Sequence, residues 1–137
     1  MCTITPEALQ DNGIDPLRVP GSLHAAEHAA IGLLPLVASC DRGDIGGVST
    51  AIGPDGLPTI FVYDGHPGGA GFADRGFRQL PVWWEATAAA IEACECRMGC
   101  PSCVQSPKCG NGNEPLDKEG AIGVLRLVLG ELAKDGA

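Results

Sequence analysis

Five cysteines in a short stretch carry the strongest chemical signal in this sequence. They lie within sixteen residues, as Cys94-Glu-Cys96-Arg-Met-Gly-Cys100-Pro-Ser-Cys103-Val-Gln-Ser-Pro-Lys-Cys109. A tetrahedral zinc ion takes four thiolates at about 2.3 Å, and a Cys-x-x-Cys turn brings two of them onto one ion. Residues 100–103 form such a turn. The spacing therefore predicts a zinc knuckle that holds one structural Zn²⁺.

Four ligand positions and five cysteines leave one cysteine over. Spacing favours Cys94, Cys96, Cys100 and Cys103 as the ligands, with Cys109 as a substitute if the loop folds back. A disulfide-stapled loop and an iron–sulfur cluster are the alternatives, because thiols serve all three kinds of site. The chain has seven cysteines, an odd number, and no signal peptide, and both observations argue against disulfides.

Two histidines form a second candidate site. His24 and His28 are four residues apart with Glu27 between them, so on a helix both imidazoles share a face. Asp41 and Asp44 follow in the next loop and offer carboxylates for a second metal site or for proton transfer. The favoured interpretation is structural, with the histidines bracing that loop against the helix. The metalloprotease motif His-Glu-x-x-His is absent, because no glutamate directly follows the first histidine.

The predicted elements place the cysteines between two helices. Helices are predicted over residues 22–38, 72–80 and 82–93, and a last one begins after Asp117 as its N-cap. Strands over residues 45–52 and 58–63 are joined across Gly53-Pro54-Asp55-Gly56, a hairpin signal, and the second strand is the central one. The predicted fold class is α+β: a small antiparallel hairpin packed with three to four helices, and the zinc loop between the last two helices.

Two further local patterns give structural expectations. Residues 64–71 contain four glycines, and they predict a tight strand-to-helix turn because neither the P-loop nor the dinucleotide pattern is present. Trp83 and Trp84 are adjacent on a helix and so point about 100° apart. One of them is expected in the core and the other at an exposed or interfacial position.

Composition sets the domain organisation and the expected partners. A chain of 137 residues that is 45% hydrophobic forms one domain, here predicted over residues 21–137 after a linker or N-terminal arm over residues 1–20. No apolar run reaches the roughly 20 residues that a bilayer requires, which predicts a cytoplasmic protein without a membrane contact. The net charge of −8 predicts weak binding to nucleic acid. A local patch of cations favours phosphate near the metal loop: Arg97, Lys108, Lys118 and Arg126.

Four motifs, in order along the chain, carry a resemblance to a known family. They are Leu23-His-Ala-Ala-Glu-His-Ala29, Cys40-Asp-Arg-Gly-Asp-Ile-Gly-Gly47, Tyr63-Asp-Gly-His-Pro-Gly-Gly-Ala-Gly71 and Gly99-Cys-Pro-Ser-Cys-Val-Gln-Ser-Pro-Lys-Cys-Gly-Asn111, followed by Leu116-Asp-Lys118. Together they resemble the C-terminal zinc-binding domain of DEAD/DEAH-box DNA helicases of the mitomycin repair factor A type. In that family the domain follows a two-lobed superfamily 2 motor, and the family's cysteine ligands correspond to the four that spacing favours.

The resemblance implies an accessory role and no catalysis by this chain alone. The sequence contains neither the Walker A motif nor the Asp-Glu-x-His box, so a helicase motor in cis or in trans must hydrolyse ATP. The expected function is that of a structural-zinc domain that stabilises the motor of a DNA-repair helicase or guides its DNA. Two alternatives stay open. One is a hydrolase or nuclease that uses His24, His28, Asp41 and Asp44, and the other is a protein-interaction module.

Overall fold

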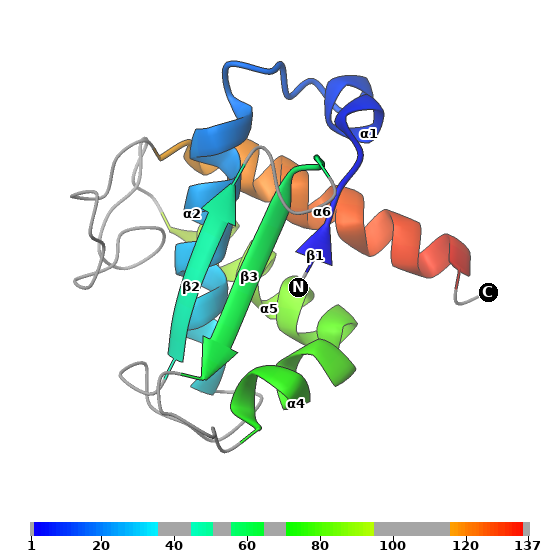
Figure 1. The fold of residues 1–137 in the computed structure, drawn as a ribbon. Coiled ribbons are helices and arrows are strands. Elements are labelled where there is room, and N and C mark those ends of the chain that lie inside the picture. The colour runs from blue at the N-terminus through cyan, green and yellow to red at the C-terminus, as the bar shows by residue number, and fades with distance from the viewer. Residues whose placement is uncertain (1, 36–44, 51–55, 65–70, 95–115, 136–137) are drawn as a thin grey trace.

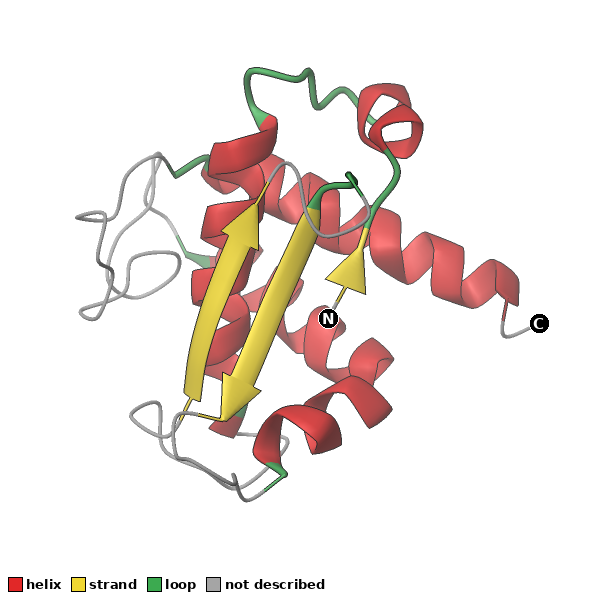
Figure 2. Cartoon of the chain, in the orientation of Figure 1, coloured by secondary structure: helices red, strands yellow, loops and turns green. Residues whose placement is uncertain are grey.

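The computed structural model describes residues 2–35, 45–50, 56–64, 71–94 and 116–135. Within these residues, a three-stranded antiparallel sheet packs on five helices, which confirms the predicted α+β class (Figures 1 and 2). In chain order the elements are β1 (Cys2–Thr3), α1 (Pro6–Asp11), α2 (Val19–Leu33), β2 (Ile45–Thr50), β3 (Thr59–Asp64), α4 (Phe72–Arg78), α5 (Leu80–Ala93) and α6 (Lys118–Asp135).

The sheet has the order β1-β3-β2, so β3 is the central strand, as its β-prone residues predicted. β2 and β3 pair antiparallel over their full lengths, from Ile45 opposite Asp64 to Thr50 opposite Thr59. Gly56 has φ of 76°, the left-handed conformation expected for the glycine that ends the hairpin turn. Residues 51–55 of that turn lie outside the described part.

The sequence did not predict the third strand or the helix that follows it. β1 pairs with the free edge of β3, with Cys2 opposite Ile60, and α1 begins with Thr5 as its N-cap. Ile4, Leu9 and Ile14 of this stretch are buried in the core. Residues 2–18 therefore form part of the folded unit, although they show little periodicity. One strand of two residues and one helix of six are too short to give a clear repeat.

Helix α2 is the centre of the fold. The sheet covers one side of it, and α5 and α6 cover the other side (Figure 1). It begins at Val19, earlier than predicted, and Ser22 is not its N-cap, because the Ser22 N–H already donates to the Arg18 carbonyl at 2.9 Å. Pro20 lies in the first turn, where a missing N–H costs nothing. α2 ends at Leu33, before the predicted end at residue 38, and its C-cap Leu34 keeps helical backbone angles, φ −57° and ψ −36°.

Both tryptophans of α5 are fully buried, so the prediction that one would be exposed is wrong. The Trp83 indole N–H donates to the Ala30 carbonyl of α2 at 2.7 Å. The two indole rings lie 4.5 Å apart and meet edge to face, and Phe77 of α4 packs against both. Helix α5 contacts α2, α4 and α6, so side chains that point 100° apart still meet protein on both sides.

The last helix follows its prediction closely. Asp117 caps α6, since its carboxylate accepts the backbone N–H of Gly120 at 2.8 Å. Gly71 caps α4 with φ of 79°. The rest of the predicted strand-to-helix turn, residues 65–70, lies outside the described residues. Within the described part of the chain, no helix combines the length and the apolar character needed to cross a bilayer.

Candidate metal centres

The cysteine segment (residues 94–109) leaves the fold at the end of α5. Cys94 is the C-cap of that helix and has extended backbone angles, φ −76° and ψ 127°, so the helix stops where the predicted ligands begin. Its side chain is half-buried, and it packs against the core. The other four predicted ligand candidates lie outside the described residues: Cys96, Cys100, Cys103 and Cys109.

The two ends of the cysteine segment's loop are held together. Lys118, the first residue of α6, is only 8% exposed, and its Nζ donates to the carbonyl oxygen of Cys94 at 2.7 Å. Residues 95–115 therefore depart from α5 and return to α6 at one place. Because the ends of the loop are already joined, less loop-closure entropy remains to be lost when its thiolates bind an ion. The anchored ends and the thiolate donor set fit a structural zinc ion that fixes α5 against α6.

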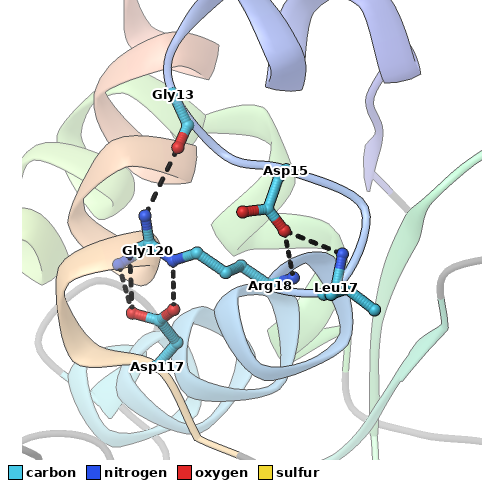
Figure 3. A network of polar contacts seen from close by, with 6 residues as sticks. All are labelled: Gly13, Asp15, Leu17, Arg18, Asp117 and Gly120. Atoms are coloured by element: carbon cyan, nitrogen blue, oxygen red, sulfur yellow. Dashed lines mark hydrogen bonds and ion pairs between the residues drawn. The ribbon is translucent and has the colours of Figure 1, made fainter.

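A second clamp holds the start of α6 against the start of α2. The Arg18 guanidinium donates to both carboxylate oxygens of Asp117, from Nε at 2.7 Å and from Nη2 at 3.2 Å (Figure 3). The Asp117 N–H also donates to the Gly21 carbonyl at 3.0 Å. Arg18 holds the pKa of Asp117 below its usual value, with help from the Gly120 N–H, while burial opposes the shift. The residues that follow the cysteine segment are thus fixed to two helices.

The two predicted histidines do lie together, and Glu27 joins them in what we call the His–Glu cluster (His24, Glu27 and His28). Each side chain offers one ligand atom, and these three atoms lie within 4.8 Å of one another. All three residues are buried, and the imidazole rings lie 4.2 Å apart at an angle of 64°. Asp41 and Asp44, the other members of the predicted second site, lie outside the described residues.

Glu27 is the member of this cluster that the sequence analysis did not propose as a ligand. Burial raises its pKa to about 7, and a hydrogen bond with the Ser49 side chain on β2 opposes the rise. A Cβ at Gly47 would lie 3.0 Å from Glu27 Oε2, so this glycine lets the carboxylate approach the strand. Its position three residues after His24 was the available signal, because residues at i and i+3 share a helix face.

Two members of the predicted phosphate-binding patch are occupied within the fold. Lys118 is buried against Cys94, as described above. Arg126 donates from Nη1 to Glu85 at 2.6 Å and from Nε to Glu92 at 3.0 Å. The other two cations, Arg97 and Lys108, lie outside the described residues. Of the two described cations of the patch, Lys118 is thus buried, whereas Arg126 is exposed in ion pairs with Glu85 and Glu92.

Comparisons with known proteins agree with this architecture. A family model described as the MrfA Zn-binding domain matches residues 26–104. An uncharacterised protein of Methanocaldococcus jannaschii is 36% identical over an alignment of 111 residues that covers 78% of this chain and 99% of that protein. The ATP-dependent helicase YprA of Bacillus subtilis is 42% identical over 73 residues, 53% of this chain and 10% of the helicase.

A solved structure shows the same fold. The crystal structure of the helicase MrfA bound to DNA matches with a TM-score of 0.62 at 30% identity, over 91% of this chain and 15% of that one. The chain thus spans nearly all of its archaeal relative, but only about a tenth of YprA.

Proposed function

Because the chain belongs to the MrfA Zn-binding domain family, as its motifs predicted, we propose that it is the structural-zinc accessory domain of an ATP-dependent superfamily 2 DNA helicase that acts in DNA repair. The observation that carries this proposal is the joined end of α5 and start of α6, where the Lys118–Cys94 contact closes the cysteine segment's loop. This loop connects two helices of the core, so metal binding there bears on how the end of α5 is held against the start of α6.

Zinc is the metal of this family, and the proposed ligands in this chain are Cys94, Cys96, Cys100 and Cys103. All four fall within the matched residues 26–104, whereas Cys109 falls beyond them. Four thiolates leave no open position for a water molecule, so the ion supplies structural order and no catalysis. Its role is to order a polar stretch rich in glycine and proline that cannot form a core of its own.

The proposed partner is a helicase motor, in cis or in trans. YprA and MrfA are helicases, and in each of them the matching part is a small fraction of the chain. The archaeal relative, by contrast, is covered over 99% of its length, which supports an arrangement in which such a domain meets its motor in trans.

Of the two roles expected from the sequence, stabilising the motor has the better support. The net charge is −8, and Lys118 and Arg126 are engaged in internal contacts. A surface of this kind repels phosphate, so we expect DNA to bind weakly to this domain alone and strongly only to the complete helicase. Contact with the motor does not require a basic surface.

The test joins this chain to the motor of an MrfA-type helicase from which the motor's own zinc domain has been removed. Unwinding of a tailed duplex and ATP hydrolysis are measured for the wild-type domain and for a variant with all four proposed ligands changed to serine. A matched control, Cys109→Ser, changes a cysteine outside the proposed ligand set. We expect the fourfold variant to lose both activities and the control to keep them.

The pattern of loss separates the two roles. A fourfold variant that hydrolyses ATP normally but no longer unwinds indicates that the domain guides DNA. If that variant unwinds as well as the wild type, the accessory role itself is wrong. An exposed tryptophan would have suited the interaction-module alternative, but both tryptophans are buried.

A further inference from the structure

The His–Glu cluster has no part in the proposed zinc role, and its residues are unusual for a helix interior. His24 is 8%, Glu27 5% and His28 3% exposed, within a helix whose other buried residues are small or apolar except for Ser22. Charged residues are almost never buried unless they are paired or bind a metal. Three buried side chains that can all bind a metal therefore lie together in the middle of α2.

We propose that His24, Glu27 and His28 bind a second divalent metal ion of the zinc class, through two imidazole nitrogens and one carboxylate oxygen. This site is distinct from the thiolate site of the cysteine segment in its ligand chemistry and in the elements that build it. The same ligand set, two histidines and a glutamate, binds zinc in several metalloenzymes. It also suits cobalt and iron as divalent ions.

The geometry of the three ligand atoms is close to what such an ion needs. Zinc holds nitrogen and oxygen ligands at about 2.0–2.2 Å, which places ligand atoms about 3.3–3.6 Å apart in a tetrahedron. The observed atoms lie within 4.8 Å of one another. The centre of a triangle with sides of that length is about 2.8 Å from each corner, so each atom must move inward by less than about 1 Å. Small side-chain rotations provide that movement.

The spacing of the two histidines supports their part in this site. His24-Ala25-Ala26-Glu27-His28 has the pattern His-x-x-Glu-His, in which two histidines one helical turn apart bind zinc in one class of metalloenzymes. The spacing puts all three side chains on one face of α2. Here that face is turned toward β2, because Glu27 contacts Ser49 and lies beside Gly47.

A divalent ion also resolves the cost of burying this carboxylate. An ionised carboxylate removed from water needs a counter-charge, and Glu27 is only 5% exposed. A cation bound between Glu27 and the two imidazoles supplies that charge. The ion would then also fix α2 against β2 through the Glu27–Ser49 contact.

The test titrates the intact chain, already loaded with one equivalent of zinc, with Co²⁺. We expect one equivalent of Co²⁺ to bind as the second metal ion of the chain. Its spectrum should show the visible bands of tetrahedral or five-coordinate Co²⁺, without the near-ultraviolet sulfur-to-cobalt charge transfer of a thiolate site. Elemental analysis after removal of unbound metal should give two ions per chain. A total of one metal ion per chain, or bound Co²⁺ that shows thiolate charge transfer, overturns the proposal.

Variants then assign the ligands. Glu27→Gln keeps the shape of the side chain, while His24→Gln and His28→Gln remove the imidazoles. In each variant, the affinity of the His–Glu cluster for Co²⁺ should fall by about 100-fold or more, and the thiolate-bound zinc should stay in place. Ser22→Ala, a buried polar change on the same helix, and Glu92→Gln, an exposed carboxylate, are the matched controls and should bind Co²⁺ like the wild type.

One further measurement keeps the proposal testable if a histidine variant does not fold. X-ray absorption at the cobalt edge of the wild-type chain, with zinc in the first site, counts the ligands of the second ion. A shell of nitrogen and oxygen that includes imidazole scattering supports the cluster. A shell that contains sulfur, or one made of water alone, rejects it.

Discussion

The cysteine segment and the His–Glu cluster both bring metal ligands together, but they do so in different ways. In the cysteine segment the ligands are close in sequence on a stretch too polar to fold alone, so the ion must create the order. In the His–Glu cluster a complete helix and the facing strand hold the ligands in place before any ion arrives. The structure of the cysteine segment should therefore depend on its metal ion. Metal binding at the His–Glu cluster should instead depend on how α2 packs against β2.

Removing zinc should have the largest effect and should fall on one end of the molecule. We expect stripping with a strong chelator to lower the free energy of unfolding by on the order of 5 kcal/mol, because the ordering of the loop is lost with the ion. Thermal melts followed by circular dichroism measure the loss. Hydrogen exchange should speed up most at the end of α5 and the start of α6.

A uniform increase in exchange over all elements would contradict this difference between the two sites. The same exchange experiment on the Glu27→Gln variant, with zinc left in the cysteine segment, provides the control. That variant should leave the end of α5 protected.

The contact between Lys118 and the Cys94 carbonyl, which joins the ends of the cysteine segment's loop, should have the next largest effect on stability. Replacing Lys118 with methionine keeps much of the buried side chain but removes the donor to the Cys94 carbonyl. A buried hydrogen bond to a charged group contributes about 1.5–3 kcal/mol, so we expect a loss of about 2 kcal/mol in urea unfolding. Zinc affinity should fall with it, since the loop ends are no longer joined.

The matched control for Lys118 is Arg126→Met on the same helix. Arg126 is exposed and pairs with Glu85 and Glu92, and exposed ion pairs contribute about 1 kcal/mol or less. If both variants lose the same stability and zinc affinity, the Lys118 anchor has no special role at the cysteine segment.

Packing around the His–Glu cluster gives a smaller effect. A methyl group at Gly47 would come within 2.7 Å of Ile31 Cδ1 and 3.0 Å of both Glu27 Oε2 and the Phe61 carbonyl. Gly47→Ala should cost about 1.5 kcal/mol, because Ile31 can move but the Phe61 backbone cannot. Titration with Co²⁺ should show weaker binding at the His–Glu cluster, while the zinc content stays at one ion per chain.

The neighbouring glycine is a natural control because successive strand residues face opposite sides of the sheet. The atoms nearest to a methyl group at Gly46 would belong to the Tyr63 ring and its hydroxyl, and this residue is 50% exposed and can swing into solvent. Gly46→Ala should leave the second metal site unchanged. Equal loss of Co²⁺ binding in both variants would show that the sheet as a whole, and not the Glu27 face, supports the cluster.

Local sequence signals were enough for much of the fold. The β-prone run around Ile60, the cap at Asp117 and the left-handed glycine at Gly56 were all predicted, because each depends on a few neighbouring residues. The failures lie where distant parts of the chain meet. Strand β1 exists only because β3 offers it an edge, and Trp84 is buried only because α5 lies between other helices.

The candidate sites divide in the same way. Spacing alone predicts the cysteine ligands, since a knuckle is built from residues close in sequence. The histidine pair was also visible, as a shared helix face. The position of Glu27 on the same helix face was a weaker signal, because its burial depends on Ser49 and Gly47, which belong to a strand some twenty residues away.

The clamp between α2 and α6 gives the smallest effect, and it tests whether the two sites are mechanically linked. Arg18 lowers the pKa of Asp117, so the ionised carboxylate stabilises the fold above the unfolded pKa of about 3.9, and this contribution is lost as the pH falls through the lower folded value. Asp117→Asn keeps an oxygen for the Gly120 N–H but removes the charge, and it should cost about 1 kcal/mol at pH 7. Unfolding free energies of both proteins between pH 7 and 3 should therefore converge below about pH 4. Parallel curves would show that the ion pair contributes nothing.

Metal binding by Asp117→Asn then tests the link between the two sites. If the variant binds zinc more weakly but binds Co²⁺ at the His–Glu cluster like the wild type, the clamp serves the cysteine segment alone. Weaker binding of both metal ions would link the two sites through the start of α2.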